Sequence, residues 1–132
     1  MMSLRKLHLT LLEETLAVCR MSQDAAIPSF TLNDSFFSIT RTRDELSIVC
    51  QADQTPSGAN VDSGWRCFKI EGPFEFTEIG VLASVIDPLR SALLSVFAIS
   101  TYDTDYLLVK EADVGRARET LTMAGHLVGP KT

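Results

Sequence analysis

The stretch SVFAISTYDTDYLLVKE (Ser95–Glu111) lies across two runs of apolar and β-branched residues that a short polar segment separates. The first run, Leu94–Thr101, and the second, Asp105–Lys110, have the length and residue types of β-strands. Tyr102-Asp103-Thr104 between them is typical of a turn. We therefore predict a β-hairpin, and the elements on either side of it decide the fold class.

A strand and a helix precede this hairpin. Trp65–Glu71 (WRCFKIE) has the pattern of a strand. From Glu78 the apolar residues recur at helical spacing, and Pro88 within the pattern lacks a backbone donor, so the last turn is expected to kink or the helix to end early. The apolar face of this predicted helix comprises Ile79, Leu82, Ala83, Ile86 and Leu89.

A second helix follows the hairpin, with Asp113 as its expected N-cap and Gly125 as its C-cap. The order from residue 65 is strand, helix, strand, strand, helix, and one more strand would complete β-α-β-β-α-β, the ferredoxin-like unit of the α+β class. The tail Leu127–Gly129 is short for that role, so the N-terminal half is a second candidate source of the strand. The apolar stripe of the second helix comprises Val114, Ala117, Leu121 and Ala124.

The N-terminal half contains a similar hairpin. FFSITRTRDELSIVC (Phe36–Cys50) aligns with Val96–Lys110 at an offset of 60 residues, with three identities in fifteen positions and matching apolar columns and turn. This favours a duplication in which the two units share one packed body, because about 60 residues alone bury little surface. We expect a degenerate, helix-poor N-terminal unit over residues 1–61 and a second unit over residues 62–132.

The rest of the N-terminal half shows no helical pattern. Residues 7–20 are expected to be extended, as one strand or as two short strands around Glu13-Glu14. Residues 23–33 contain Pro28 and predict a loop or a single turn. Ala52–Gly64 is dense in turn residues and is the best linker candidate.

Composition argues against several classes of protein. The 132 residues include 12 Lys or Arg and 17 Asp or Glu, a net charge of −5 with a pI of about 4.9, which disfavours nucleic-acid binding. No apolar run approaches the ~18–20 residues of a membrane-spanning helix. Glu13 and Glu14 interrupt the N-terminal apolar stretch, which we interpret as mature protein and not a signal peptide. Cys19, Cys50 and Cys67 have no close pairing in sequence, which fits buried thiols in a reducing cytoplasm.

Motifs for catalysis or metal binding are nearly absent. His8 and His126 are the only histidines, and an ordinary buried or surface role explains each. Cys67 has no neighbouring base to make it a nucleophile. Asp103 and Asp105 could act as an acid and a base or bind a metal, although a solvated turn explains them equally. We therefore expect no catalytic residue, no metal and no cofactor.

One segment has residue types suited to ligand binding. EFTEIGVLASV places Gly80 between a predicted strand and a predicted helix. The N–H groups at a helix start attract anions, carboxylates included, and a glycine lets a ligand approach the backbone closely. The alternative interpretation is that Gly80 permits tight packing of helix on strand.

Three segments together resemble a known family. GVLASVIDPL (Gly80–Leu89), Ser95–Glu111 and FFSIT (Phe36–Thr40) are similar to the ACT-domain proteins, in the branch of the CASTOR-type arginine sensors of animals and their small bacterial relatives. The most specific match is Leu94–Val109, and the similarity extends from about Phe36 to Leu121. The resemblance implies two ferredoxin-like ACT modules per chain and a regulatory, ligand-binding protein without catalytic activity.

The resemblance also implies a binding site. ACT modules typically bind a free amino acid where the strand-to-helix turn of one module faces the second strand of its partner. Helix N–H groups would hold the ligand carboxylate, while strand carbonyls, Ser95 or Asp105 would hold its ammonium group or a basic side chain. The expected ligand-binding residues are Ile79, Gly80, Val81, Ser84, Ser95, Val96, Thr101 and Asp105.

The resemblance further implies an assembly. CASTOR-type sensors have four modules in one chain, whereas this chain has room for two, which implies a homodimer with two symmetry-related sites. Asp87, Pro88 and Ala92 do not suit side-chain selection of a large ligand, so neither arginine nor the animal partner proteins are carried over. We expect a cytoplasmic homodimeric sensor of a small amino acid that signals to another protein. The alternative is a structural or protein-interaction module with an empty pocket.

Overall fold

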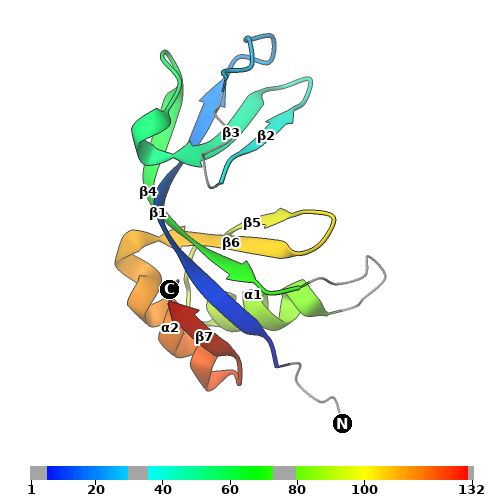
Figure 1. Ribbon diagram of the computed structural model, residues 1–132, viewed down its shortest axis with the longest axis vertical. Coiled ribbons are helices and arrows are strands. Elements are labelled where there is room, and N and C mark those ends of the chain that lie inside the picture. Colours follow the sequence, from blue (N-terminus) through cyan, green and yellow to red (C-terminus); the bar gives the residue numbers. More distant parts are fainter. Residues whose placement is uncertain (1–5, 30–35, 73–79, 131–132) are drawn as a thin grey trace. The chain divides into compact units, whose positions relative to one another are not determined.

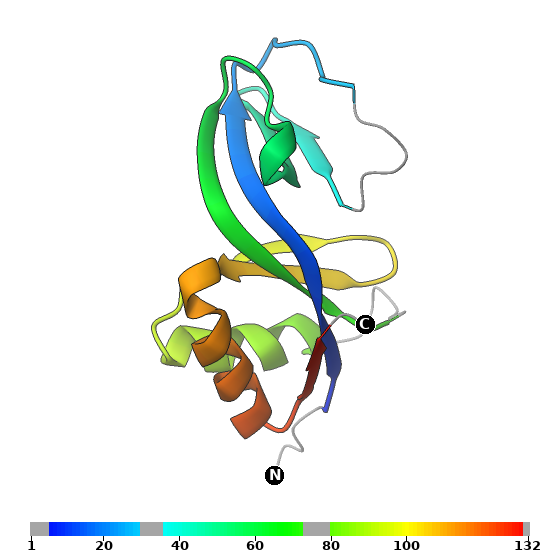
Figure 2. The same cartoon turned by 60° about the vertical axis from the view of Figure 1, so that its left-hand side comes forward.

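The computed structural model describes residues 6–29, 36–72 and 80–130, which form two compact units (Figures 1 and 2). The C-terminal unit takes its residues from Met1–Glu13 and Arg66–Thr132, and the N-terminal unit from Glu14–Trp65. This division differs from the expected boundary at residue 61 because the first strand belongs in part to the C-terminal unit.

The C-terminal unit has the β-α-β-β-α-β order and is a ferredoxin-like α+β fold, as predicted. Its second hairpin strand leads into α2 through the 3-10 turn Glu111–Asp113. The strand Leu94–Thr101 of the prediction is shorter in the structure. The elements are β4 (Asn60–Ile70), α1 (Val81–Ser91), β5 (Phe97–Ser100), β6 (Asp105–Lys110), α2 (Val114–Met123) and β7 (Leu127–Pro130).

The last strand of this unit involves both ends of the chain. β7 pairs in parallel with the start of β1 (His8–Met21), and the Leu127 N–H donates to the Leu7 carbonyl at 2.9 Å. The strand order in the unit is β7-β1-β4-β6-β5. The short tail therefore forms the last strand, and the N-terminal half contributes a strand that lies between β7 and β4.

β1 is one strand rather than two. Its first residues pair with β7, whereas Leu16–Met21 pair antiparallel with β3 (Leu46–Gln51). Glu13 and Glu14 fall between these two pairing segments. The two glutamates mark a change of partner strand and do not interrupt the strand.

Helix α1 is amphipathic, but its buried face is rotated from the predicted one. Val81, Val85 and Leu89 are buried at i, i+4 and i+8, while Ala83 is exposed. Leu82 and Ile86 pack against the core at the edge of this face; the predicted position Ile79 lies outside the described residues. Pro88 is inside the helix, which continues to Ser91. Of the two expected effects of Pro88, the early end was therefore wrong, and the kinked last turn stays a prediction.

Both helices end with the same capping motif. In α2 the C′ residue Gly125 has φ 100°, and the His126 N–H donates to the Leu121 carbonyl at 3.1 Å. In α1 the C′ residue is Leu93, with φ 62°, and the Leu94 N–H donates to the Leu89 carbonyl at 3.0 Å. These are Schellman motifs, in which glycine is the usual C′ residue. The predicted C-cap role of Gly125 is therefore confirmed.

Helix α2 begins where predicted. Asp113 is at the N-cap position, although its side chain makes no capping hydrogen bond and instead lies 3.9 Å from the Arg116 guanidinium. Ala117 and Leu121 of the predicted stripe are fully buried. One apolar cluster unites both helices with the strands of this unit: Leu7, Leu9, Leu11, Phe68, Ile70, Val81, Val85, Leu89, Leu94, Leu107, Val109, Ala117 and Leu121.

The described residues of the N-terminal unit form strands, loops and one 3-10 turn. Its strand order is β2-β3-β1-β4, and β2 (Ser38–Arg41) pairs antiparallel with β3 as the predicted hairpin. Residues 22–29 form neither strand nor helix, as predicted for that part of the loop. The linker candidate Ala52–Gly64 was partly wrong, because β4 already begins at Asn60 and Ala52–Gln54 form a 3-10 turn.

One buried apolar cluster lies in the N-terminal unit. Ala17, Cys19, Leu46, Ile48 and Cys50 are buried together. Small or partly buried residues pack on this cluster from the loops and the hairpin: Met21, Ala25, Ile39, Ala52 and Ala59. No helix of the described residues is long and apolar enough to cross a membrane.

The two hairpins are structurally equivalent at an offset of 59 residues rather than 60. β2 and β5, β3 and β6, and the 3-10 turns Ala52–Gln54 and Glu111–Asp113 are all displaced by 59. Arg41 pairs with Leu46, as Ser100 pairs with Asp105, around loops of equal length. The sequence alignment was therefore one residue out of register, and a shift of one residue places side chains on the opposite face of a strand.

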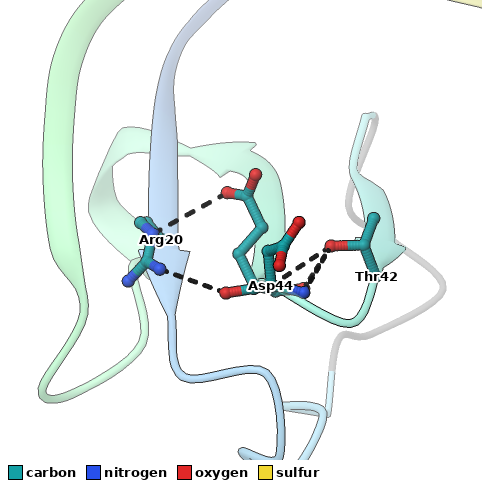
Figure 3. Close-up of polar contacts among 4 residues, drawn as sticks. Arg20, Thr42 and Asp44 are labelled. Atoms are coloured by element: carbon teal, nitrogen blue, oxygen red, sulfur yellow. Dashed lines mark hydrogen bonds and ion pairs between the residues drawn. The ribbon is translucent and has the colours of Figure 1, made fainter.

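A threonine occupies the equivalent position in both hairpin turns. The Thr42 N–H donates to the Glu45 carbonyl at 2.9 Å, and the Thr101 N–H donates to the Thr104 carbonyl at 2.8 Å. In the first turn the Thr42 hydroxyl also accepts the N–H groups of Asp44 and Glu45 at 3.1 and 3.2 Å (Figure 3). Thr42 and Thr101 are equivalent at the offset of 59, which supports that register.

Each turn is attached to a neighbouring strand by different chemistry. In the N-terminal unit Arg20 of β1 donates to the Asp44 carbonyl at 3.2 Å and lies 3.9 Å from the Glu45 carboxylate (Figure 3). In the C-terminal unit the hydroxyl of the buried Thr104 donates to the Ile70 carbonyl of β4. The first attachment is solvent-exposed, whereas the second is buried.

Candidate functional site

The start of α1 has the backbone geometry of an anion-binding helix terminus. Gly80 is at the N-cap with φ 86° and is exposed, and it has no side chain with which to cap the helix. Ser84 is the first residue whose N–H has a helical acceptor, the Gly80 carbonyl at 3.0 Å. The three preceding amides point out of the helix start, where N–H groups and the helix dipole favour a carboxylate.

Most of the segment before this helix start, residues 73–79, lies outside the described residues. Strand β4 ends at Ile70. Ile79, the first of the expected ligand-binding residues, lies outside the described residues. Val81 is only 5% exposed and packs into the core, so its side chain supports the helix start while its amide faces the terminus.

Ser84 uses its polar atoms within the C-terminal unit. Its hydroxyl donates to the Val81 carbonyl at 2.7 Å. Its own carbonyl lies 2.8 Å from Nε2 of His126. The hydroxyl therefore stabilises the first turn of α1 in the ligand-free protein.

Ser95 and Val96 lie in the segment before β5, which begins at Phe97. Ser95 is exposed, and Val96 packs partly against the core. β5 is the edge strand of the C-terminal unit, because β6 is its partner in the strand order β4-β6-β5. An edge strand offers main-chain N–H and C=O groups to a ligand or to another strand.

Thr101 and Asp105 lie at the two ends of the β5–β6 turn. The Thr101 hydroxyl donates to the Thr104 carbonyl at 3.0 Å and accepts the Thr104 N–H at 3.3 Å. The Asp105 carboxylate accepts the Ser100 hydroxyl, its cross-strand neighbour. Both expected ligand contacts are therefore engaged within the hairpin, and Asp105 retains a second oxygen.

The two aspartates of this turn differ in their burial. Asp103 is exposed and Asp105 half-buried. Within residues 6–29, 36–72 and 80–130, no three His, Cys, Asp or Glu side chains are grouped so that they could hold a metal ion.

The cysteines and histidines have the predicted environments. Cys19, Cys50 and Cys67, all among the described residues, are buried and outside disulfides. Burial raises the pKa of the Cys19 thiol, and a hydrogen bond with Cys50 partly offsets this. His8 is exposed, and His126 is buried.

Two residues near the site were missed by sequence reasoning. Thr104 was assigned only to a turn, yet its hydroxyl attaches that turn to the end of β4. His126 was explained as an ordinary histidine, yet it bonds to α1 and to the start of β1. The pattern offered no signal for either, because their partners are 34, 42 and 119 residues away in sequence.

A separate open cavity of about 310 Å³ lies in the N-terminal unit. Its lining is polar and acidic: Glu14, Thr15, Gln51, Ala52 and Asp53. None of the residues expected to bind the ligand lines it. A carboxylate ligand would find no cationic side chain in this lining.

Family models match both units. Residues 60–123 match the model of the ACT domain, which covers β4, both helices and the β5–β6 hairpin. The chain contains an ACT domain. A second model, which describes an N-terminal domain, matches residues 14–58, close to the N-terminal unit.

Curated relatives of this ACT-domain protein are CASTOR proteins. Human CASTOR3P is 34% identical over an alignment of 102 residues, and the match covers 66% of this chain and 61% of CASTOR3P. The human cytosolic arginine sensor for mTORC1 subunit 1 is 34% identical over an alignment of 95 residues, and the match covers 66% of this chain and 29% of that protein. The chain thus spans less than two thirds of the length of these relatives.

Solved structures show the same fold over most of the chain. A crystal structure of an Agrobacterium tumefaciens protein has a TM-score of 0.89 and 41% identity, covering 97% of this ACT-domain protein and 96% of that chain. E. coli aspartokinase III in complex with aspartate and ADP has a TM-score of 0.62 at 12% identity, over 92% of this chain and 33% of the kinase. At that identity the likeness concerns the fold alone.

Proposed function

We propose that this ACT-domain protein binds a free amino acid and acts as a regulatory sensor without catalytic activity. The start of α1 carries the proposal, because Gly80 exposes the helix terminus in the module that matches the ACT domain. One relative is named a cytosolic arginine sensor, and this supports an amino acid as the ligand class. The ligand carboxylate would accept hydrogen bonds from the first backbone N–H groups of α1.

The ligand's ammonium group needs an acceptor on a neighbouring strand. Asp105 has one carboxylate oxygen left after its bond with Ser100, and the exposed Ser95 lies before edge strand β5. Val96 and Thr101 would line the same edge through their main chains. A charge-assisted hydrogen bond to Asp105 would be the strongest of these contacts.

The proposed assembly is a homodimer. Among the described residues β5 is at one end of the strand order, and a strand at the end of a sheet can pair with its equivalent in a second copy. The relatives that bear the sensor name are longer, and this chain spans 29% of the human protein. Two copies would supply further modules, with one ligand site from each chain. Light scattering should give about twice the 14.5 kDa mass of the chain.

The N-terminal unit is proposed to be a degenerate ACT-like module without a site of its own. Its strand order β2-β3-β1-β4 is the ferredoxin-like order, and its hairpin repeats β5–β6 at 59 residues. The position equivalent to Gly80 is Met21, at the end of a strand and before a loop. A carboxylate would therefore find no helix start there among the described residues.

Location and partners follow from the same relatives. We propose a cytoplasmic protein, because the relatives are named cytosolic and the three cysteines are buried thiols. The net charge of −5 supports neither nucleic acid nor an anionic membrane surface as a partner. The signal would pass to an effector protein through a surface that changes on ligand binding.

A second candidate function is a protein-interaction module with an empty pocket. The Ser84 hydroxyl, the Thr101 hydroxyl and the Asp105 carboxylate all have partners within the chain. This observation favours an alternative in which these side chains stabilise the module and contact no ligand.

A thermal-shift panel of the twenty amino acids separates the two functions. The protein is unfolded and refolded first, to remove any bound ligand. A ligand present at 100 times its Kd should add ~2.7 kcal/mol of stability, a shift of several degrees. One or a few active amino acids would support a sensor, whereas a flat panel on folded protein would support the interaction module.

Matched variants locate the site. Gly80→Trp should abolish the shift, whereas Gly58→Trp places the same side chain at a similar positive φ of 79°, in the N-terminal unit, and should retain it. Asp105→Asn should weaken binding about tenfold, because a charge-assisted hydrogen bond is lost. The matched control is Asp103→Asn at an exposed neighbouring position, and it should leave the affinity unchanged. A shift that survives both site variants would overturn the proposed site.

A further inference from the structure

His126 is held entirely by main-chain atoms of the C-terminal unit. It is 2% exposed. The Leu7 N–H donates to its Nδ1 at 3.1 Å, and its Nε2 lies 2.8 Å from the Ser84 carbonyl oxygen. Because Nδ1 accepts, it carries no proton, so the ring proton is on Nε2 and is donated to Ser84.

Pro88 explains why the Ser84 carbonyl is open to this bond. In a helix the carbonyl of residue 84 would accept the N–H of residue 88, but proline has none. The proline ring also displaces the carbonyl four residues earlier from the helical direction. His126 therefore fills the gap that Pro88 leaves in the hydrogen-bond ladder of α1.

The ring connects three elements around the candidate site. Ser84 belongs to the first turn of α1, where its N–H donates a hydrogen bond to the Gly80 carbonyl. His126 precedes β7, and Leu7 precedes β1, which pairs with β7. A change at His126 would thus be transmitted to the helix terminus that the proposed ligand occupies.

We propose that His126 is a positioning residue for the ligand end of α1, acting through the carbonyl that Pro88 leaves open. The inference deepens the proposed function and rests on it for its consequence in binding. The Nε2 bond sets the place of the first turn of α1, while the Nδ1 bond holds the start of β1.

Two substitutions separate the two bonds of the ring. Asn places its amide oxygen close to the position of Nδ1, so His126→Asn keeps an acceptor for Leu7 and loses the donor to Ser84. Gln extends to the position of Nε2, so His126→Gln keeps the donor and loses the acceptor. Pro88→Ala restores a helical N–H for the Ser84 carbonyl and should rescue His126→Asn but not His126→Gln.

Amide hydrogen exchange on the ligand-free protein tests the two bonds. His126→Asn should raise exchange at the Ser84 amide by ~10-fold, as expected for a buried acceptor left unpaired, with Leu7 unchanged. His126→Gln should show the reverse pattern. Arg116→Ala is the control, because Arg116 donates to the Ala92 carbonyl at the other end of α1, at 2.8 Å; it should leave Ser84 unchanged.

Three results would overturn the inference. These are equal exchange patterns for the Asn and Gln variants, no rescue by Pro88→Ala, or ¹⁵N ring shifts that place the proton of His126 on Nδ1. L-Arginine is the binding probe, and its affinity should fall ~10-fold in His126→Asn and return with Pro88→Ala. If arginine does not bind the wild type, the proposed function stands or falls with the panel of the other amino acids, and the exchange patterns still decide the role of His126.

Discussion

The two units share a hairpin and differ in what surrounds it. β2–β3 and β5–β6 have the same strand lengths, the same threonine turn and the same following 3-10 turn, 59 residues apart. In the C-terminal unit the chain then forms α2, whereas in the N-terminal unit Pro56 and Gly58 follow and no helix forms. A hairpin is thus specified locally, while a helix-covered site needs amphipathic helical segments, which among the described residues are found in the C-terminal unit alone.

The largest expected effect compares equivalent core positions. Ile48 and Leu107 are related by the offset of 59, and both are fully buried. Replacement by alanine should cost about 2–5 kcal/mol at either position. We expect the larger loss for Leu107→Ala, because it packs in the cluster that includes both helices, whereas Ile48 packs in a smaller one. Urea unfolding of both variants measures the difference, and a larger loss at Ile48 would contradict this account.

The next effect compares the two turn attachments. Thr104→Val leaves the Ile70 carbonyl without its buried donor and should cost about 1–3 kcal/mol. Arg20→Met removes an exposed contact to the equivalent turn and should cost less than about 1 kcal/mol. Thermal unfolding of both variants tests the order, which would be refuted if the arginine variant lost more stability.

A smaller effect compares the two helix ends. Leu93 occupies the position with positive φ that Gly125 occupies in α2, and its side chain is 90% exposed. Leu93→Gly should stabilise the protein by up to about 1 kcal/mol, since a leucine costs energy in the left-handed region. Gly125→Leu should destabilise it by about 1–2 kcal/mol. Chemical denaturation measures the free energy of unfolding of both variants. A change of the same sign in the two variants would contradict this account.

The smallest effect concerns pH and the N-terminal unit. Burial raises the pKa of the Cys19 thiol in the folded protein above its ordinary value of 9.0. The unfolded chain therefore loses this proton first as pH rises, so stability is complete below pH 9.0 and falls above it. Cys19→Ala should remove that part of the alkaline loss, as followed by unfolding midpoints from neutral to alkaline pH. An identical pH profile in the variant would contradict the assignment.

Much of the candidate site could be predicted because it depends on neighbours in sequence. Gly80 before an apolar helix and the Thr101–Asp105 turn both follow from residue types and spacing. The buried face of α1 was predicted only in part. The apolar residues fit the helical period on two neighbouring faces, and the face that was chosen left out Val81 and Val85. The internal repeat was detected one residue out of register, since three identities favoured 60 while the loop geometry requires 59.

The sequence by itself determined the two hairpins, the two amphipathic helices and the resemblance to ACT domains, because each depends on periodicity and turn residues within short segments. Only the tertiary structure decided that β1 pairs first with β7 and then with β3. It alone decided that His126 bonds to Ser84 and Leu7, and that Thr104 bonds to Ile70. These contacts join residues far apart in the chain, and the packing of the whole unit, rather than any local pattern, selects such partners.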